Sequence, residues 1–385
     1  MDLIKTDIYK KLFLAIKEIT SDTQVAIFHD LDPDGLTSCA ILDRALFRIR
    51  GRRSDLHIHQ ERGGVTISQN TISTLQKKNI GVLFCLDRAV DQDPETVKSC
   101  EKICKLIVID HHQYTNDIAS ERCLFIKPDK FSEVDSSKYP TARMVYDLFF
   151  TMADLDDCDW LMAVGVIGDA AYKQWKFAID GVFDRYRITK KADVYETKLA
   201  QVTKVITSTV IVEPKDIPKL CDFLYGAKEF TDVMKSHFKT HEEAFDKEIT
   251  NWFGLVEKKG EVYPEQKTVI YYITPKYGIR SVLSTLLSIK KFNNWTMVIA
   301  EEMLDEKLLG ISIRNQSGEV DCVELVHHCI EGLEGANGGG HKPAVGGRIR
   351  KKDWKIFHTR LMERMGISQD AYEESLKKKH TVGNK

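Results

Sequence analysis

Between residues 24 and 110, short apolar runs alternate with longer amphipathic stretches. Gly81–Leu86 and Leu106–Ile109 are wholly apolar and too short for buried helices, so they predict central strands covered on both faces. Gln24–His29 and Asp55–Gln60 predict two further strands. Helical patterns between these runs are expected to start near residue 35 and to cover residues 68–78 and 94–104. This alternation predicts an α/β domain built on a parallel sheet.

After residue 138 the pattern becomes helical and stays so to about residue 258. Strand-like patterns return at residues 268–274, 296–300 and 308–314, with helices expected near 279–289 and 320–333. We therefore predict two α/β domains joined by a helical connection. The expected boundaries are 1–228 for the first domain (α/β core 22–112, helical part 138–228), 229–261 for a connecting helix, 262–370 for a smaller second domain and 371–385 for a polar, solvated tail.

Composition excludes several classes of protein. The 385 residues suffice for two domains, and 56 basic against 57 acidic residues exclude a globally basic nucleic-acid coat. No apolar run approaches the about 20 residues of a membrane helix, and the N-terminus shows no signal peptide. Nine scattered cysteines indicate reduced thiols and a cytoplasmic location; Cys100 and Cys104, one helical turn apart, are expected to pack rather than to bind zinc.

The segment His29–Gly35 (HDLDPDG) follows the first predicted strand and carries three carboxylates, on Asp30, Asp32 and Asp34. Carboxylates this close repel one another unless a cation compensates them. An EF-hand loop would need Glu at its twelfth position, where this chain has Ile41. A plainer alternative makes Asp34 a helix cap and leaves the other two carboxylates to solvent.

Three further signals follow apolar segments. Asp87 ends one predicted strand, Asp110-His111-His112 ends the next, and Asp169 follows the apolar helical sequence GVIG. Alone, Asp87 could begin a turn and the histidine pair could lie on the surface, whereas Asp169, in apolar surroundings, needs a partner. Together they are expected to converge, because ligands of open α/β sheets bind at the carboxyl ends of the strands. Oxygen donors with imidazole and no thiolate favour a pair of Mn²⁺ or Mg²⁺ ions.

A glycine-rich motif, NGGGHK followed by GGR, lies in the predicted second domain. Such backbone can present N–H groups to a phosphate, with added positive charge from neighbouring side chains; the alternative is a flexible turn. The expected anion-binding residues are Gly338, Gly339, Gly340, His341, Lys342 and, from a neighbouring strand, Arg314.

A basic cluster follows the first motif. It comprises Arg44, Arg48, Arg50, Arg52 and Arg53. It is expected to form a solvated face, with contact to a nucleic-acid backbone as the alternative.

The four acidic and histidine motifs in this order, with DHH third and GGGH in a separate domain, resemble the DHH phosphoesterase superfamily. The resemblance covers residues 22–365 and is nearest to the RecJ and oligoribonuclease (nanoRNase) branch; Asp30 favours the RecJ side. It implies two domains facing each other across a cleft and a dinuclear manganese site. The implied metal ligands are Asp30, Asp32, Asp34, Asp87, His111 and Asp169, with Asp87, His111 and His112 catalytic and Asp110 supporting them.

The resemblance implies a manganese-dependent phosphodiesterase, with Mg²⁺ as the second candidate ion, that hydrolyses single-stranded DNA or RNA from an end through an activated water. The alternatives are a nanoRNase or a cyclic or linear dinucleotide phosphodiesterase. Less favoured are a catalytically silent replication scaffold, because every motif is complete, and a pyrophosphatase. Expected partners are single strands, short oligonucleotides and replication or repair proteins.

Overall fold

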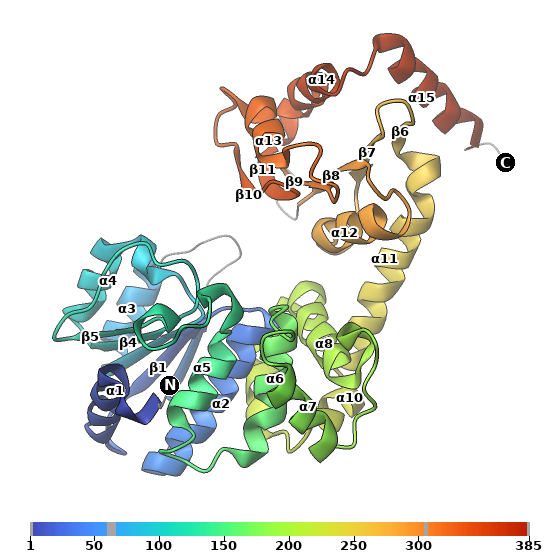
Figure 1. Cartoon of the computed structure of the whole chain (residues 1–385). Helices are drawn as coiled ribbons and strands as arrows, with labels where there is room; N and C mark the ends of the chain where they lie inside the picture. Colours follow the sequence, from blue (N-terminus) through green and yellow to red (C-terminus); the bar gives the residue numbers. More distant parts are fainter. Residues whose placement is uncertain (1–2, 60–66, 304–306, 383–385) are drawn as a thin grey trace. The chain divides into compact units, whose positions relative to one another are not determined.

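The computed structural model describes residues 3–59, 67–303 and 307–382 (Figure 1). The chain divides into two compact units, Met1–Glu242 and Glu243–Lys385. Gln60, the last residue of one predicted strand, and the end of the predicted tail at 383–385 lie outside the described residues.

The first unit is built on a five-stranded sheet in the order β2-β1-β3-β4-β5, and every neighbouring pair is parallel. The strands are β1 (Val25–His29), β2 (Leu56–His59), β3 (Val82–Leu86), β4 (Lys105–Ile109) and β5 (Cys123–Ile126). The predicted parallel α/β sheet is thus confirmed. Strand β5 was not predicted, because the run CLFI is short and lies next to a long irregular segment.

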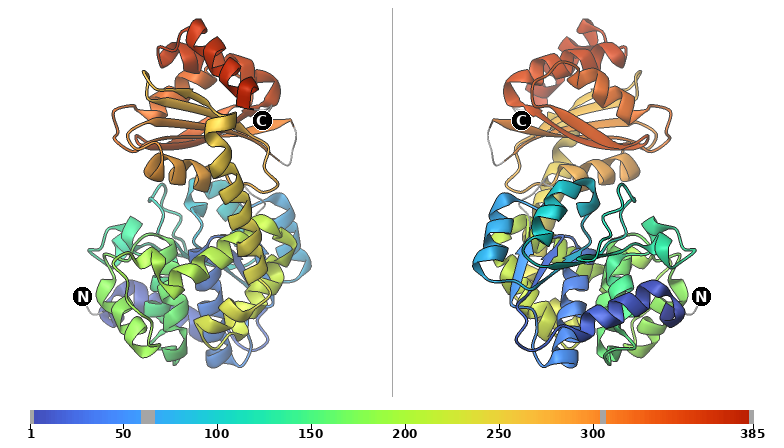
Figure 2. Two further views of the ribbon diagram at one scale, coloured as in Figure 1. Left: turned by 90° about the vertical axis from the view of Figure 1, so that its right-hand side faces the viewer. Right: turned by 90° about the vertical axis from the view of Figure 1, so that its left-hand side faces the viewer.

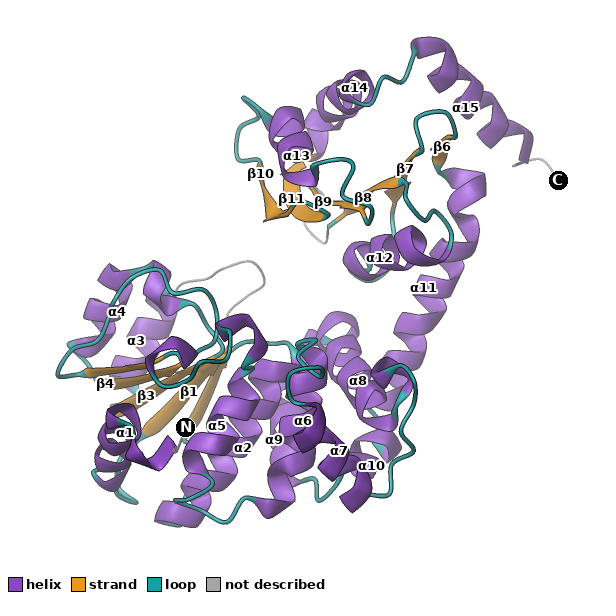
Figure 3. Cartoon of the chain, in the orientation of Figure 1, coloured by secondary structure: helices purple, strands orange, loops and turns teal. Residues whose placement is uncertain are grey.

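Helices cover both faces of this sheet (Figure 3). Val25 and Ile27 of β1 belong to the core formed with α1, α2 and α5, whereas Ala26 and Phe28 belong to the core beneath α3 and α4. The alternation of side chains along the strand produces this division. The helices are α1 (Asp7–Lys17), α2 (Pro33–Arg50), α3 (Gln69–Lys77), α4 (Pro94–Glu101) and α5 (Thr141–Phe149). Cys100, in α4, and Cys104, shortly after it, are buried in this second core, which confirms that they pack.

In the described part of the chain, five further α-helices belong to the first unit, and a sixth, α11, begins there and continues into the second unit. They are α6 (Asp159–Gly168), α7 (Lys176–Arg185), α8 (Lys198–Val212), α9 (Ile217–Gly226), α10 (Phe230–Lys235) and α11 (Lys239–Lys259). The predicted single connecting helix is therefore two helices, because the chain turns between α10 and α11. Short 3-10 helices are η1 (Leu3–Lys5), η2 (Val90–Gln92), η3 (Pro128–Lys130), η4 (Ser136–Lys138), η5 (Asp156–Cys158), η6 (Val194–Glu196), η7 (Pro214–Asp216) and η8 (Lys351–Asp353). Within the described residues, no helix has both the length and the hydropathy that a membrane crossing requires.

The arginines from residue 44 to 53 form internal contacts, so the predicted solvated face is wrong. Arg44 is buried and donates to the carbonyl oxygens of Leu224 and Ala227. Arg50 donates to backbone carbonyls, including that of Thr23 at 2.7 Å. The other three pair with carboxylates: Arg48 with Asp157, Arg52 with Asp55, and Arg53 with Asp43 and Asp222. Arg44 and Arg48 thereby join α2 to segments that are more than one hundred residues away in the sequence.

The second unit holds a mixed six-stranded sheet in the order β10-β11-β9-β8-β7-β6, with β7 and β8 parallel and the other pairs antiparallel. Figure 2 shows this sheet between α12 on one face and the C-terminal helices on the other. The strands are β6 (Glu261–Tyr263), β7 (Thr268–Ile273), β8 (Thr296–Glu302), β9 (Leu308–Asn315), β10 (Asn337–His341) and β11 (Ala344–Arg350). The helices are α12 (Arg280–Lys290), α13 (Cys322–Ile330), α14 (Trp354–Arg364) and α15 (Gln369–Val382). Helix α15 replaces the predicted solvated tail, since it contacts β6.

Candidate metal centre

Aspartates lie at the carboxyl ends of three neighbouring strands of the first unit. Asp30 follows β1, Asp87 follows β3 and Asp110 follows β4. Because the strands are parallel, their carboxyl ends share one edge of the sheet. Asp32 caps α2 by accepting a hydrogen bond of 2.8 Å from the Gly35 amide, which starts the helix directly after β1.

Asp34 is completely buried in the first turn of α2. Its two carboxylate oxygens accept hydrogen bonds from the Thr141 amide at 2.6 Å and the Ala142 amide at 2.8 Å. Both amides belong to the start of α5, where the helix dipole favours negative charge. Burial nevertheless raises the pKa of Asp34 well above its usual value, and the neighbouring Asp87 charge adds to the effect.

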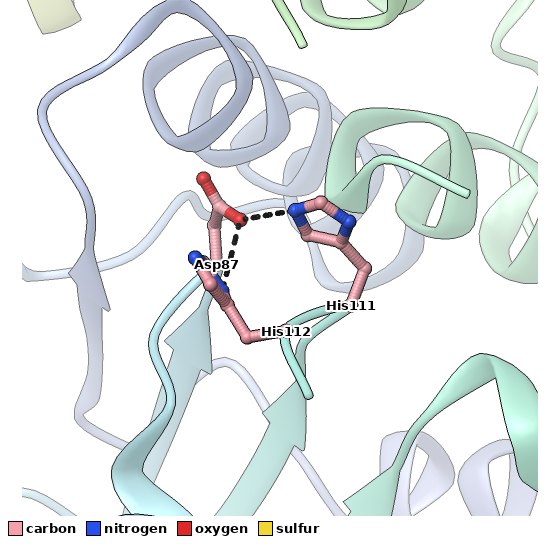
Figure 4. A group of neighbouring side chains, drawn as sticks. All are labelled: Asp87, His111 and His112. Atoms are coloured by element: carbon pink, nitrogen blue, oxygen red, sulfur yellow. Dashed lines mark ion pairs between the residues drawn. The ribbon is translucent and has the colours of Figure 1, made fainter. Parts of the chain in front are cut away.

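Asp87 and His111 face each other across the ends of β3 and β4 (Figure 4). The His111 Nε2 atom lies 3.4 Å from Asp87 Oδ1, and Thr141 Oγ1 donates to the same oxygen at 3.2 Å. Asp87 adopts a left-handed backbone conformation with φ of 58°. Strained residues of this kind concentrate at functional sites.

His111 is the common neighbour of three carboxylates. Its Nε2 atom is 3.4 Å from Asp169 Oδ2 and 4.0 Å from Asp34 Oδ2, in addition to the Asp87 contact. Burial lowers the pKa of His111, but the hydrogen bond and charge of Asp87, with help from Asp34 and Asp169, raise it to about 10. We call Asp34, Asp87, His111 and Asp169 the His111 cluster. The sequence predicted all four as metal ligands, and the structure brings them together.

The ligand atoms of this region form two groups that fit a metal ion. One group is Asp87, His111 and His112; the other is Asp34, His111 and Asp169. They share His111 and contain only oxygen and imidazole donors. This donor set suits Mn²⁺ or Mg²⁺ better than a thiolate-seeking ion. His112, which the sequence placed outside the ligand set, lies within one group.

The other two predicted ligands stand apart from these groups. Asp30 Oδ1 lies 3.3 Å from the Arg88 guanidinium and accepts the Leu31 amide at 2.7 Å. Asp32 uses Oδ1 as the cap of α2, and burial together with the nearby charge of Asp87 raises the pKa of Asp32 well above its usual value. The structure thus places both at the same edge of the sheet but does not bring them into either group of three.

Two glycines bring α6 against the cluster. A methyl group on Gly165 would lie 2.8 Å from Asp34 Oδ1 and 2.5 Å from Ala142 Cβ, and one on Gly168 would lie 2.8 Å from Pro33 Cβ. These distances are shorter than van der Waals contact. The small residues of the GVIGD sequence therefore let α6 approach closely enough to present Asp169.

Three contributors to the site were missed in the sequence. Thr141 supplies an amide and a hydroxyl, Arg88 contacts Asp30, and Lys127 lies behind Asp110. Pro140-Thr141 carries a weak helix-start signal that could have identified the first. Neither Arg88 nor Lys127 stands in a motif, and only the packing of β3, β4 and β5 reveals them.

The glycine-rich motif of the second unit forms a β-hairpin, so the alternative of a flexible turn is wrong. Strands β10 and β11 pair with Gly338 opposite Gly347 and Gly339 opposite Gly346. We call residues 337–350 the glycine hairpin. A methyl group on Gly338 would meet Val326 of α13 at 2.8 Å, whereas one on Gly339 or Gly346 would meet no atom within 4 Å. One face of the hairpin thus packs on α13, and the other is open.

The open face carries basic side chains. His341 stands opposite Ala344, which stands opposite Arg314 on β9, so these three residues share the face of Gly339. The Arg314 guanidinium donates to the carbonyl oxygens of Ile313 and Val345 at 3.0 Å, which fixes its position. His341 and Lys342 are exposed. The arrangement leaves backbone and positive charge accessible on one side.

Each unit matches the model of a known domain family. The model of the DHH family N-terminal domain matches residues 24–166. The DHHA1 domain matches residues 266–363. The chain therefore belongs to the DHH phosphoesterase superfamily, with the fold of its RecJ-like branch.

Solved structures agree on the fold. The chain is similar to exonuclease RecJ bound to manganese, with 14% sequence identity and a TM-score of 0.70, covering 97% of this chain and 98% of that one. It is also similar to RecJ in complex with Mn²⁺ from Thermus thermophilus, with 15% identity and a TM-score of 0.69, covering 94% of this chain and 55% of that one. The present chain thus spans about half the length of the Thermus chain. No curated protein sequence matches it.

Proposed function

We propose that this chain is a manganese-dependent exonuclease that hydrolyses single-stranded DNA or RNA from an end. The observation that carries the proposal is the gathering of Asp34, Asp87 and Asp169 around His111 Nε2 at the carboxyl ends of the strands. The His111 Nε2 atom has one lone pair and would hold one ion, so a second ion would depend on the carboxylates. Carboxylate-rich sites with two divalent ions are the arrangement that many phosphodiesterases use. Mg²⁺ is the second candidate ion. The proposed ligands are Asp30, Asp32, Asp34, Asp87, His111 and Asp169.

When bound, the ions would supply an activated water and neutralise charge on the phosphoryl oxygens. The protein groups keep the donors in place for this chemistry. The amides of α5 hold both oxygens of Asp34, and Thr141 holds Asp87. His112 Nδ1 is held by Asp110 Oδ1 at 2.7 Å, which leaves its Nε2 atom to contact a phosphoryl oxygen.

We assign substrate binding in the second unit to the open face of the glycine hairpin. Accessible backbone next to Arg314, His341 and Lys342 suits a phosphate of the nucleic-acid strand. Such contacts position the strand without reading its sequence. On the open face the proposed contact residues are Gly339, His341 and Arg314, with Lys342 directly after His341; Gly338 and Gly340, which the sequence also suggested, belong to the opposite face of the strand.

The test is hydrolysis of end-labelled single strands, in DNA and in RNA, from dinucleotides to strands of roughly thirty nucleotides. We expect manganese-dependent release of mononucleotides from long strands, abolished by chelation of the metal and restored by adding Mn²⁺ back. Labels at the 5′ and 3′ ends reveal the polarity. Turnover confined to the shortest substrates would replace this proposal by a nanoRNase or dinucleotide phosphodiesterase. Binding of long strands without any hydrolysis would contradict it.

A further inference from the structure

Lys127 is a completely buried lysine directly behind the DHH motif. Strand β5 pairs with β4 so that Ile126 stands opposite Ile109, and the next residues, Lys127 and Asp110, therefore leave the sheet side by side. The Lys127 ammonium lies 2.5 Å from Asp110 Oδ2 and donates to the His112 carbonyl oxygen at 2.8 Å. The sheet register thus fixes a positive charge against the aspartate of the motif.

The two oxygens of Asp110 have separate partners. Oδ2 accepts from Lys127, while Oδ1 accepts from His112 Nδ1 at 2.7 Å and from the His112 amide at 3.3 Å. A carboxylate held on one side by an ammonium has a fixed plane, so it orients the imidazole on its other side. Burial opposes ionisation of Asp110, but the His112 hydrogen bond and the Lys127 charge together hold its pKa well below the usual value.

Lys127 also faces a second buried carboxylate. Asp91 Oδ1, in η2, lies 3.6 Å from the Lys127 ammonium. Asp91 Oδ2 accepts the Thr115 amide at 2.7 Å, and the Asn116 side chain donates to the Asp91 carbonyl oxygen at 2.9 Å. The segment after His112 has no helix or strand through residue 120, so these contacts hold it in place. The Lys127 ammonium therefore lies close to two buried carboxylates, Asp110 and Asp91. Two roles follow from these contacts: orientation of Asp110, or neutralisation of Asp91.

We infer that Lys127 is a positioning residue for His112: through Asp110, it fixes the imidazole that contacts the substrate. This inference rests on the proposed function of the same site. The competing role is structural, in which Lys127 only neutralises the buried Asp91. The contacts favour the first role, since Lys127 lies closer to Asp110 and also binds the backbone of His112.

The decisive variants are Lys127→Met and the double variant Lys127→Met/Asp91→Asn. The single change leaves the buried carboxylates of Asp110 and Asp91 without the Lys127 ammonium, so this variant can fail to fold. The double change leaves only Asp110 buried without the ammonium, and Asp110 keeps its two contacts with His112, so the double variant is expected to be more stable than the single one; a melt checks that it is folded. In the double variant we expect kcat to fall about 10- to 100-fold with KM nearly unchanged, as for other groups that orient an active-site residue. Recovery of wild-type kcat would overturn the inference, because Lys127 would then only neutralise Asp91.

The matched control is Lys130→Met. Lys130 lies three residues further along and pairs with Asp117 at 3.3 Å on a partly exposed surface, away from Asp110. We expect wild-type kcat and KM from this variant. A loss equal to that of the double variant would show a general effect of charge removal in this segment, and would also overturn the inference.

A measurement without turnover separates this inference from the proposed function. Nitrogen-15 NMR of the histidine rings, with His112 identified by a His112→Asn variant, reports the tautomer in the metal-free protein at one pH. We expect the proton on Nδ1 in the wild type and a mixture of tautomers in the double variant. The same tautomer in both proteins would refute the positioning role, even if the wild type hydrolysed nucleic acid as proposed.

Discussion

Asp34 and Asp87 lie in the interior of the first unit, whereas Gly339 and His341 lie on an open sheet face of the second unit. The aspartates are held by amides, a hydroxyl and imidazole, and their burial requires a compensating cation. The open face of the hairpin has little packed against it. The comparison indicates that the first unit holds the proposed catalytic side chains in fixed positions, while the second unit presents backbone and side chains that a substrate can reach. Substitutions in the first region should therefore affect kcat and stability, and those in the second should affect KM.

The largest effect is expected for Asp87→Asn. Asparagine tolerates the left-handed conformation of residue 87, so the fold should be retained. This change removes the carboxylate that lies next to both His111 and His112. We expect kcat to fall by more than about 100-fold, because residues that only orient a metal ligand cost about 10- to 100-fold when they are replaced. Steady-state kinetics with saturating Mn²⁺ and a circular dichroism melt test this. Turnover at the wild-type rate would refute the assignment of the metal site.

The next largest effect is expected for Gly165→Ala. The added methyl group would press on Asp34 and Ala142, which should lower the free energy of unfolding by about 1–3 kcal/mol and reduce kcat. The control is Gly181→Ala in α7, where the new methyl group meets no atom within 4 Å. That change should stabilise the helix by about 0.5–1 kcal/mol. Urea unfolding measures the free energy of unfolding of both variants. If Gly165→Ala were as stable as Gly181→Ala, α6 would have moved to make room for the methyl group, and the prediction would be wrong.

A smaller effect is expected from pH on the metal-free protein. The folded pKa of His111 is raised to about 10 from 6.5, so its contribution to stability is complete below pH 6.5 and is lost as pH rises towards 10. Bound Mn²⁺ replaces that proton, and the melting temperature gap between Mn²⁺-loaded and metal-free protein should widen from pH 6.5 to 8.5. If one proton is displaced by the ion, the stability difference between the Mn²⁺-loaded and metal-free protein can change by at most about 1.4 kcal/mol per pH unit. A gap that narrows over this range would contradict the arrangement around His111.

The smallest effect on stability is expected for Gly339→Ala. The methyl group would lie on the open face, so the free energy of unfolding should change by less than about 0.5 kcal/mol. If that face binds the strand, KM for a long substrate should rise several-fold while kcat is kept. Gly254→Ala in α11, equally uncrowded, serves as the control. An unchanged KM for Gly339→Ala would remove the open face from the substrate contact.

The sequence predicted the parts of the fold that depend on local pattern. The apolar runs ending at Leu86 and Ile109 are long enough to define strands, and each is followed at once by a charged residue. Strand β5 and helix α15 were not predicted, because one is short and the other is rich in polar residues. The basic run from Arg44 to Arg53 was misjudged, since several of its acceptors, such as the carbonyl oxygen of Leu224 and the carboxylate of Asp157, are more than one hundred residues away in the chain.

The sequence by itself determined the chemical set: aspartates and histidines after successive strands, and glycines in a second α/β unit. Only the tertiary structure decided how this set is arranged. It made His111 the shared neighbour of Asp34, Asp87 and Asp169, and it placed Lys127 behind Asp110. Motif order is a local property of the chain, whereas the charge and hydrogen-bond partners of a buried group come from segments that only packing brings together.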